Sequence, residues 1–396
     1  MPEGPPARHL PARAEVVVVG GGVMGTSTAF HLAEAGVDVL LVERGQLAGG
    51  STSRAAGGVR AQFSDPLNIT LGARGLDAFA RFAERPGQEI DLHRNGYLFL
   101  LTRPDDVAAF EAAVALQNDL GVPTRLLDAA EAGGLAPGVR TDDVLAATFH
   151  QGDGYCAPES VVLGYASGAR RHGATVLTGV EVVGLDPRTD GPTTVRTTAG
   201  DVAAGAVVCA AGAWSKTLGA MAGVDLPVTP LRRQILVTEP LPDAVAAVLP
   251  ASMPFTIDAA TTFYLHREGP GVLLGMSWTG EEPGFREDRD DAWLPDLTEV
   301  IERRAPALLD VGIATGWAGL YEVTPDHNAL LGEAATSAGG RFLYATGFSG
   351  HGFLQGPAVG EILRDLYLGR EPFVDVTPLS AARFASGTLR PERAIV

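Results

Sequence analysis

The sequence predicts a mixed α/β (α+β) protein of two interleaved domains, one built on a parallel sheet and the other on an antiparallel sheet. The chain has 396 residues, which is enough for two to three average domains. Near each end, apolar stretches finish in glycine-rich turns that lead into helices, as in parallel α/β units. Residues 230–280 instead alternate apolar and polar side chains, as antiparallel strands do.

The strongest predicted elements lie at the start of the chain. A β-branched run at 14–19 is typical of a buried parallel strand, and it ends at Gly20. A helix closed by Gly36 follows at 26–36, and 37–42 form a second buried strand. Because these elements together take only about 30 residues, they predict a Rossmann-like unit.

Shorter patterns predict the remaining elements. Helices are expected at 105–121, 157–172, 294–305 and from about 357 to 368. Strands are expected at 96–101, 174–177, 181–185, 194–197, 206–212 and 342–347. Strands typical of the two kinds of sheet follow one another along the chain, so we expect the chain to cross between the domains several times.

Composition and charge disfavour several classes of function. A formal net charge of −17 repels nucleic acids and anionic membranes, so neither is an expected partner. No apolar run approaches the ~18 residues of a membrane span, and residues 1–13 lack the apolar core of a signal peptide. Cys156 and Cys209 form no CxxC pair, which predicts no disulfide framework, no metal site and a cytoplasmic location.

A glycine motif predicts dinucleotide binding. Gly20, Gly22 and Gly25 form a Gly-x-Gly-x-x-Gly pattern between the first strand and the first helix. Such glycines permit a tight turn and let backbone N–H groups and the helix N-terminus approach a pyrophosphate. Glu43 ends the second strand, where its carboxylate can accept hydrogen bonds from both ribose hydroxyls. A carboxylate there disfavours a 2′-phosphate, so the motif favours FAD or NAD over NADP.

Two further loops favour FAD over NAD. Residues 48–58 are small and rich in hydroxyl groups, so the chain can pass closely along an extended cofactor while donating hydrogen bonds. Taken alone, this segment has a flexible surface loop as its alternative interpretation. A second glycine turn, 347–353, precedes a helix and could place backbone donors against a flavin ring. The alternative there is an ordinary turn that carries a structural histidine.

Together these motifs resemble the D-amino-acid oxidase superfamily of flavoproteins. The resemblance rests on GGGVMG (20–25), LLVERG (40–45), GGSTSRAAGGVR (49–60), VVCAAGAWS (207–215), TPDHNALLG (324–332) and ATGFSGHGF (345–353). Within the superfamily the chain is most similar to the β-subunit branch of sarcosine oxidase and proline dehydrogenase. The resemblance implies a Rossmann-like FAD domain, an antiparallel substrate domain that covers the flavin, and oxidation of an amine by hydride transfer to flavin N5.

The resemblance also implies a division of the chain and a set of cofactor contacts. The predicted FAD domain comprises 14–92, 145–225 and 316–375, the substrate domain comprises 93–144 and 226–315, and 1–13 form a disordered tail. The expected FAD contacts are Gly20, Gly22, Val23, Met24, Gly25, Glu43, Arg44, Ser51, Thr52, Ser53, Arg54, Gly57, Gly58, Val182, Ala211, Gly212, Trp214, Gly347, Gly350, His351, Gly352 and Phe353.

The cofactor is expected to be bound without a covalent link. Relatives tether FAD at positions that hold Gly319 and Arg54 here, and they tether FMN at a position that holds Pro158. None of these three side chains can form the corresponding bond to a flavin.

Four residues are expected at the reacting centre. Arg60 matches the family arginine that receives the substrate carboxylate, for which its forked guanidinium group is suited. Tyr264 and Tyr321 resemble aromatic residues of the pocket wall, and His351 is expected to have a positioning role near the flavin. The alternatives are a surface ion pair for Arg60 and ordinary core packing for the tyrosines.

The predicted reaction is FAD-dependent oxidation of a secondary or N-methylated amino acid, such as sarcosine or proline, or of a larger carboxylate-bearing amine. One alternative is oxidation of a 2-hydroxy acid, and another is a flavin-holding β-type subunit that needs a partner chain; a homo-oligomer is also compatible with the sequence. The expected electron acceptor is oxygen, a quinone or a partner flavin. Leu273 stands where monomeric sarcosine oxidases carry their oxygen-activating lysine, and Lys216 is the only lysine of the chain, which predicts slow reaction with oxygen.

Two other segments have open interpretations. His266 and His327 are candidates for a general base, although a structural role is favoured for His327 in its turn. The acid-rich segment 281–291 is predicted as a solvated loop, with an active-site lid as the alternative.

Overall fold

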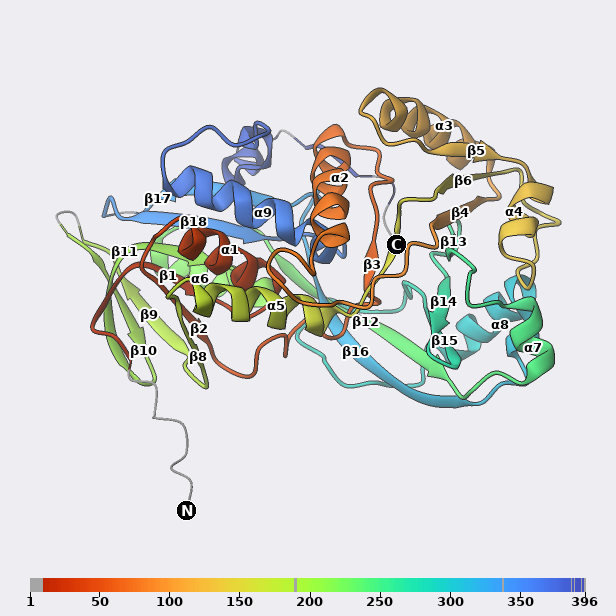
Figure 1. Ribbon diagram of the computed structural model, residues 1–396, viewed down its shortest axis with the longest axis horizontal. Helices are drawn as coiled ribbons and strands as arrows, with labels where there is room; N and C mark the ends of the chain where they lie inside the picture. The colour runs from red at the N-terminus through yellow and green to blue at the C-terminus, as the bar shows by residue number, and fades with distance from the viewer. Residues whose placement is uncertain are drawn as a thin grey trace, which may run out of the picture.

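The computed structural model describes residues 10–188, 191–336, 338–385, 387, 389–392 and 394. Within these residues, the strands form two eight-stranded sheets and one two-stranded sheet, and Figure 1 shows the two large sheets in opposite halves of the molecule. Residues 1–9 of the predicted tail lie outside the described residues, whereas Arg13, also assigned to that tail, begins the first strand.

The first sheet has a parallel centre. Its main path runs β17-β18-β11-β1-β2-β8, and β9 and β10 extend it as antiparallel strands beside β11. The bounds are β1 Arg13–Val19, β2 Val39–Glu43, β8 Thr175–Thr178, β9 Val182–Asp186, β10 Thr193–Thr197, β11 Gly200–Cys209, β17 Leu330–Ala335 and β18 Arg341–Thr346. β1, β2, β8, β11 and β18 run parallel, which confirms the parallel sheet that the buried β-branched runs predict.

Helices cover both faces of this sheet. One face carries α1 (Val23–Glu34), α5 (Pro158–Arg171) and α9 (Gly352–Tyr367), which lie along the strands in Figure 1. α6 (Ser215–Ala222) packs in the apolar cluster of the other face. α1 is buried along almost its whole length, and an added Cβ on Gly360 of α9 would lie 2.3 Å from Ser27 Oγ. Glycine therefore permits the close packing of these two helices.

The second sheet is mostly antiparallel, in the order β16-β12-β15-β14-β13-β4-β6-β5. The bounds are β4 Tyr97–Leu101, β5 Arg125–Leu127, β6 Ala146–His150, β12 Thr229–Thr238, β13 Phe255–Asp258, β14 Tyr264–Glu268, β15 Gly271–Gly275 and β16 Ile313–Val323. One pair departs from the predicted antiparallel pattern, because β13 runs parallel to β4. The long connection between β4 and β13 permits the parallel pairing, since it returns the chain to the end of the sheet at which β4 begins.

Strand alternation gives the second sheet two different faces. Leu98, Leu236 and Leu274 point into an apolar cluster on one face, together with Trp293 and Leu297. This cluster includes residues of α4 (Ala129–Leu135) and α8 (Leu294–Arg304), and α7 (Asp243–Val248) lies at its edge. The opposite face carries aromatic and β-branched side chains, namely Tyr97, Phe99, Phe255, Ile257 and Tyr264, and these turn toward the first sheet.

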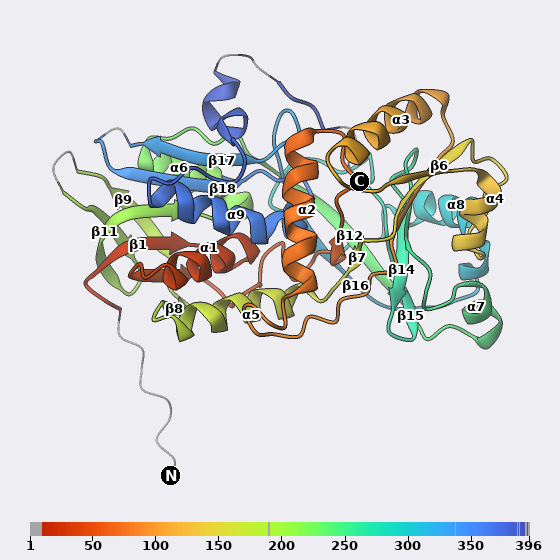
Figure 2. The same ribbon diagram turned by 45° about the horizontal axis from the view of Figure 1, so that its top comes forward.

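Further segments connect the two halves. α2 (Pro66–Ala80) stands between them in both views (Figure 1 and Figure 2), and α3 (Pro104–Asp119) covers the outer end of the second sheet. β3 (Gly58–Val59) pairs with β7 (Gly154–Tyr155) in the two-stranded sheet. β6 and β16 belong to the second sheet, although the predicted division gives 145–150 and 316–323 to the first domain. The division itself stays a prediction.

The start of α9 corrects one predicted boundary. The sequence places this helix from about 357, but it begins at Gly352 and contains Pro357. The glycine-rich stretch 347–352 that leads into it looks like a loop in the sequence, and proline is itself a common first residue of a helix. Both signals therefore delay the predicted start.

Candidate active site

A cavity of about 550 Å³ begins at the carboxyl ends of β1 and β2 and reaches the aromatic face of the second sheet. The lining passes from Glu43 and Val182, along the turn after β1, to Tyr321 on β16 and Tyr264 on β14. It therefore joins a trough on the first sheet to a pocket on the second.

The turn after β1 is built for close backbone packing. Gly20 has φ +119°, and a Cβ there would lie 2.2 Å from the Ala210 carbonyl oxygen. A Cβ on Gly25 would lie 1.9 Å from the Gly20 carbonyl oxygen. α1 begins just after Gly22, with no acidic residue in its first turn. Its N-terminus consequently presents a partial positive charge toward the cavity, as a bound pyrophosphate requires.

Glu43 is held at the ribose position that the sequence predicts. One carboxylate oxygen accepts a hydrogen bond from the Gly21 N–H at 2.7 Å, and the other accepts one from the Gly45 N–H at 2.7 Å. These bonds fix the carboxylate beside the glycine turn while its edge still lines the cavity.

The loop after Glu43 ties the two halves together. Thr52 Oγ1 accepts a hydrogen bond from the Val23 N–H at 3.2 Å, and Ser51 Oγ donates to the Leu320 carbonyl at 2.6 Å. Arg44 lies over the Trp214 ring, with Cζ 3.8 Å from the ring centroid. The alternative of a flexible surface loop is therefore wrong, because this loop lies between α1 and β16.

The acid-rich segment 281–291 is a mostly exposed loop that is anchored by ion pairs. Glu281 is buried and pairs with the buried Arg232 at 2.8 Å, and Asp290 pairs with the same guanidinium group. Glu287 lines the cavity and pairs with Arg54 at 2.8 Å. Most residues of the segment are exposed, as predicted for a solvated loop, while Glu287 borders the cofactor trough, so the lid alternative stays a prediction.

Most of the predicted cofactor residues line the cavity. The exceptions are Gly25, Ser53 and Gly347. Gly25 serves helix packing, as described above, while the Ser53 N–H bonds the Ala48 carbonyl within the loop. Gly347 has φ +70°, and a Cβ there would lie 2.4 Å from Thr324 Cγ2, so it shapes the turn. Contact of the others with FAD stays a prediction.

His351 lies at the junction between trough and pocket. Its ring is buried, stands 5.3 Å from the Phe63 ring, and has two nitrogens that lack a hydrogen-bond partner among the described residues. Burial lowers the pKa of His351, so the ring is neutral. α9 begins immediately after it without a side-chain cap. The glycine turn, the ribose carboxylate, two helix N-termini whose N-cap residues make no side-chain cap, and this ring together fit FAD.

Arg60 lies buried in the pocket. It lines the cavity, and its Cζ lies 4.0 Å from the centroid of the Phe63 ring. Its guanidinium group donates to the Gln62 carbonyl, and to the Ala394 carbonyl at 2.6 Å. It forms no ion pair with a carboxylate anywhere in the described part of the chain. The alternative of a surface ion pair is therefore wrong.

Asp153 supports the segment that carries Arg60. Its carboxylate accepts hydrogen bonds from the Ala61 N–H at 2.9 Å and from Gln62 Nε2 at 3.0 Å. His150 Nδ1 lies 2.7 Å from the same carboxylate, and Thr148 Oγ1 donates to Gln62 Oε1. This buried network holds the two residues that directly follow the arginine.

Three tyrosines share the pocket with Arg60. Tyr264 and Tyr321 are in the predicted set, and Tyr97, at the start of β4, was missed. Burial raises the pKa of all three phenols, so each hydroxyl stays protonated and can donate a hydrogen bond. A Cβ on Gly350 would lie 2.3 Å from the Tyr321 ring, so this ring packs directly on the second glycine turn.

Sequence reasoning also missed Arg233 and Glu322, which line the same cavity. Arg233 pairs across the sheet with Gly319, and the alternation of β12 is the signal that could have placed it. Glu322 follows Tyr321 on β16, and its carboxylate accepts a hydrogen bond from Thr346 Oγ1 at 3.0 Å. Burial raises the pKa of Glu322 to about 7.

The other candidate bases lie outside the cavity lining. The two ring nitrogens of His266 lie 2.8 Å and 3.1 Å from the Arg267 and Ala56 carbonyls, and burial lowers the pKa of this histidine to about 4. His327 adopts φ +59° in its turn. Lys216 is exposed on α6. These placements favour structural roles for both histidines.

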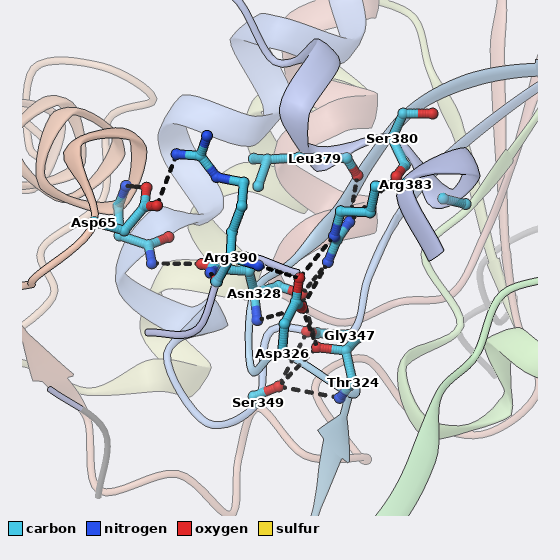
Figure 3. Close-up of polar contacts among 12 residues, drawn as sticks. Asp65, Thr324, Asp326, Asn328, Gly347, Ser349, Leu379, Ser380, Arg383 and Arg390 are labelled. Carbon is cyan, nitrogen blue, oxygen red and sulfur yellow. Dashed lines mark hydrogen bonds and ion pairs between the residues drawn. The ribbon is translucent and has the colours of Figure 1, made fainter. Parts of the chain in front are cut away.

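The turn that carries His327 is tied to the C-terminal segment (Figure 3). Asp326 accepts two hydrogen bonds at 2.9 Å from the buried Arg383 guanidinium group. Arg390 pairs with Asp65 at 2.7 Å, at the start of α2. Thr324 and Ser349 link this turn to the second glycine turn. The C-terminal segment thereby fixes one wall of the pocket and reaches Arg60 through Ala394.

Comparison with known proteins identifies the type of chain. A model of a family described as FAD dependent oxidoreductase (DAO) matches residues 15–366. The chain is 32% identical over 394 residues to the mitochondrial dimethylglycine dehydrogenase of Rattus norvegicus, covering 95% of this chain and 45% of that protein. It therefore spans about half the length of this relative. It is 30% identical to glycine oxidase of Geobacillus kaustophilus, covering 94% and 97% of the two chains.

Solved structures agree with these matches. The crystal structure of L-proline dehydrogenase from P. horikoshii superposes with a TM-score of 0.88 at 31% identity, covering 96% of this chain and all of that chain. Glycine oxidase from Geobacillus kaustophilus superposes with a TM-score of 0.82 at 26% identity, covering 94% and 99%. No helix of the described residues is long and apolar enough to cross a membrane.

Proposed function

Because the chain belongs to the FAD-dependent oxidoreductase (DAO) family, we propose that it oxidises a secondary or N-methylated amino acid, or a larger carboxylate-bearing amine, to an imine. The names of its relatives, dimethylglycine dehydrogenase, glycine oxidase and L-proline dehydrogenase, support an amino-acid substrate. The observation that carries the proposal is the buried Arg60, which faces the same cavity as the predicted cofactor residues and has no carboxylate partner among the described residues.

The residues that would hold FAD follow the trough. The N-terminus of α1 would receive the pyrophosphate, Glu43 the ribose, and the turn before α9 the flavin. When bound, FAD supplies the redox chemistry, since it accepts a hydride from the carbon beside the substrate nitrogen and passes the electrons to an acceptor. Gly319 and Arg54 at the tether positions, and two cysteines outside the cavity lining, support binding without a covalent link.

The side chains of the pocket bind and orient the substrate. Arg60 receives its carboxylate, and the protonated hydroxyls of Tyr97, Tyr264 and Tyr321 are available to donate hydrogen bonds to it. Ile257 and Phe255 line the same space and exclude water from the reacting carbon. An arginine clamp beside an apolar wall suits a substrate whose reacting carbon is apolar and lies next to a carboxylate.

His351 is poorly suited to serve as the base that oxidation of a 2-hydroxy acid would require, which leaves Glu322 as the candidate base for that alternative. Oxidation of a hydroxyl group requires a base for its proton, and the burial that lowers the pKa of His351 makes it a weak proton acceptor. An amine needs no such base when it binds in its neutral form. The enzyme would then belong to the oxidoreductases that act on CH–NH groups, and the two free thiols suit the proposed cytoplasmic location.

Anaerobic reduction of the bound flavin tests the proposal. The holoenzyme is mixed with sarcosine, N,N-dimethylglycine, proline, glycine and lactate, and the visible flavin absorbance is followed. We expect secondary or N-methylated amino acids to bleach it fastest. Bleaching by lactate alone would support the hydroxy-acid alternative, and bleaching by none of them would contradict the proposed substrate class.

Two simple measurements address the remaining alternatives. Gel filtration of the lone chain, with its FAD content and activity, separates a self-sufficient enzyme from a subunit that needs a partner. Acid precipitation should release the yellow colour into the supernatant, and colour retained in the pellet would overturn non-covalent binding.

A further inference from the structure

Arg233 contributes a second guanidinium group to the cavity. On β12, the alternation of side chains sends Arg232 to the other face of the sheet, where Glu281 and Asp290 neutralise it. Arg233 instead lines the cavity, and its Cζ lies 5.2 Å from the centroid of the Tyr321 ring. Adjacent arginines of one strand therefore have opposite electrostatic environments.

Arg233 forms no ion pair with a carboxylate of the described residues, although the Glu281 carboxylate acts on it at longer range. Its Nη1 donates to the Arg232 carbonyl at 3.1 Å, while its buried Nε has no hydrogen-bond partner among the described residues. In the described part of the chain, Arg60 likewise forms no ion pair with a carboxylate. Arg60 is buried and Arg233 is half-buried. Removing a charge from water without a counter-charge is unfavourable, so two such guanidinium groups in one cavity indicate an anionic ligand.

Both guanidinium groups lie close enough to Tyr321 to influence its hydroxyl group electrostatically. Burial raises the pKa of the Tyr321 hydroxyl, and the positive charges of Arg233 and Arg60 partly offset this rise. Arg60 also acts on Tyr97 and Arg233 on Tyr264, so the three tyrosines lie among the two cations. The phosphates of FAD would not neutralise either cation, since the glycine turn that fits them is at the other end of the cavity.

We propose that the preferred substrate carries two acid groups, with Arg60 receiving the carboxylate beside the amine and Arg233 receiving a second carboxylate on the side chain or on the N-substituent. This inference rests on the proposed function and specifies its substrate class as N-substituted amino dicarboxylic acids. A bidentate pair with a guanidinium group makes the second carboxylate a determinant of specificity.

Binding of two unreactive ligands tests the inference without turnover. Thiodiacetate has sulfur in place of the amine and two carboxylates, whereas methylthioacetate has the same skeleton with one carboxylate. Each is titrated into the oxidised holoenzyme, and Kd is read from the change in flavin absorbance and from calorimetry. We expect thiodiacetate to bind at least about tenfold more tightly, because each hydrogen bond to a charged group contributes about 1.5–3 kcal/mol.

Variants assign this preference to a residue. Arg233→Gln should weaken thiodiacetate at least about tenfold and change methylthioacetate less than about threefold, and Arg233→Lys should retain part of the preference. Arg60→Gln should weaken both ligands. FAD content is measured in each preparation, so that loss of the cofactor is not mistaken for loss of ligand binding.

Three results would overturn the inference. Equal affinity of the wild-type holoenzyme for the two ligands would do so even if no variant folds. Equal weakening of both ligands by Arg233→Gln would show that Arg233 acts as a general charge, and an unchanged preference would remove it from the site.

Reduction of the flavin by N-methylaspartate and N-methylalanine separates the two proposals. Reduction by both at similar affinity leaves the proposed function standing, whereas reduction by neither contradicts the function itself.

Discussion

The two ends of the cavity are built in different ways. The cofactor end consists largely of two short stretches, 20–25 and 43–58, and the shape of their backbone forms most of the trough. The substrate end collects Arg60, Tyr97, Arg233, Tyr264 and Tyr321, of which the last four come from four strands of the second sheet. A backbone-shaped site leaves a local pattern in the sequence, whereas a site of side chains from distant strands does not. The two ends should also respond differently to substitution.

Gly25→Ala should have the largest effect, and it should act through the cofactor end. The new Cβ would lie 1.9 Å from the Gly20 carbonyl oxygen, which is backbone and cannot move without opening the turn. We expect a loss of at least about 3 kcal/mol in the free energy of unfolding, together with loss of most bound FAD. Urea denaturation and flavin absorbance per mole of protein measure the two effects.

Gly134→Ala is the matched control for that substitution. Gly134 lies in α4, and a Cβ there meets nothing within 4 Å. Alanine should therefore stabilise α4 by up to about 1 kcal/mol and leave the FAD content unchanged. If Gly25→Ala behaved like this control, the glycine turn would be less constrained than its geometry indicates.

Arg60→Gln should impair the substrate end of the cavity while leaving the cofactor end intact. It removes the charge that faces the substrate carboxylate, so we expect a loss of about 100-fold in affinity for an amino-acid ligand, or about 2.7 kcal/mol. The bound FAD should remain, because the trough does not depend on this side chain. Ligand titration of the holoenzyme gives the affinity, with Arg303→Gln on the exposed face of α8 as control. Loss of FAD at the same time would show that the two ends are coupled.

The same contrast explains what the sequence could predict. Gly20, Gly22, Gly25 and Glu43 lie close together in the chain, and each has one steric or hydrogen-bonding reason to be there, so that end could be identified directly. Arg60 was found through resemblance to a family. Arg233 was missed because its partners across the sheet depend on the register of β12 with β16.

The secondary-structure elements also divide into those that a local pattern predicts and those that depend on distant parts of the chain. β1, α1 and β2 form where the apolar pattern predicts them, since burial on both faces requires continuous apolar strands. The parallel pairing of β13 with β4 was missed because no pattern within either strand encodes the direction of its neighbour. The ion pairs that anchor the acid-rich loop were missed because Arg232, which neutralises Glu281 and Asp290, lies about 50 residues away in the sequence.

Glu322 lies between the two ends of the cavity, and it should make the stability of the protein depend on pH. Its pKa is raised to about 7, so the folded state favours the protonated form, and stability should fall as pH rises from about 4.5 to 7. Glu322→Gln removes this dependence. In the FAD-free protein we expect the variant to be more stable by about 2 kcal/mol at pH 8 and to match the wild type at pH 5.

Urea unfolding across this pH range measures the difference. Glu299→Gln, on the exposed face of α8, provides the control for the change from carboxylate to amide. A variant that is less stable than the wild type at pH 8 would mean that the charged carboxylate is favoured, and that Thr346 and the neighbouring backbone N–H groups outweigh burial.

The smallest expected effect concerns oxygen, and it tests whether the substrate end lacks an oxygen-activating charge. Leu273 is buried among Tyr264, Ile235 and Phe255 on the cavity-facing side of the second sheet. A positive charge about 4 Å from the flavin would favour electron transfer to oxygen by a few kcal/mol, and leucine supplies none. We therefore expect the reduced enzyme to react at least about tenfold more slowly with oxygen than with a quinone or dye.

Stopped-flow reoxidation of the reduced enzyme measures both reactions. Leu273→Lys should raise the rate with oxygen about tenfold, while Leu273→Met, which keeps an apolar side chain of similar volume, should leave it unchanged. Arg233 already brings a positive charge to the same cavity, and this charge could itself promote the reaction with oxygen. If the wild type reacts with oxygen as fast as with the quinone, and Arg233→Gln slows only the oxygen reaction, then the arginine takes the place of the missing lysine. The charge of the substrate end would in that case serve the second half of the reaction as well as substrate binding.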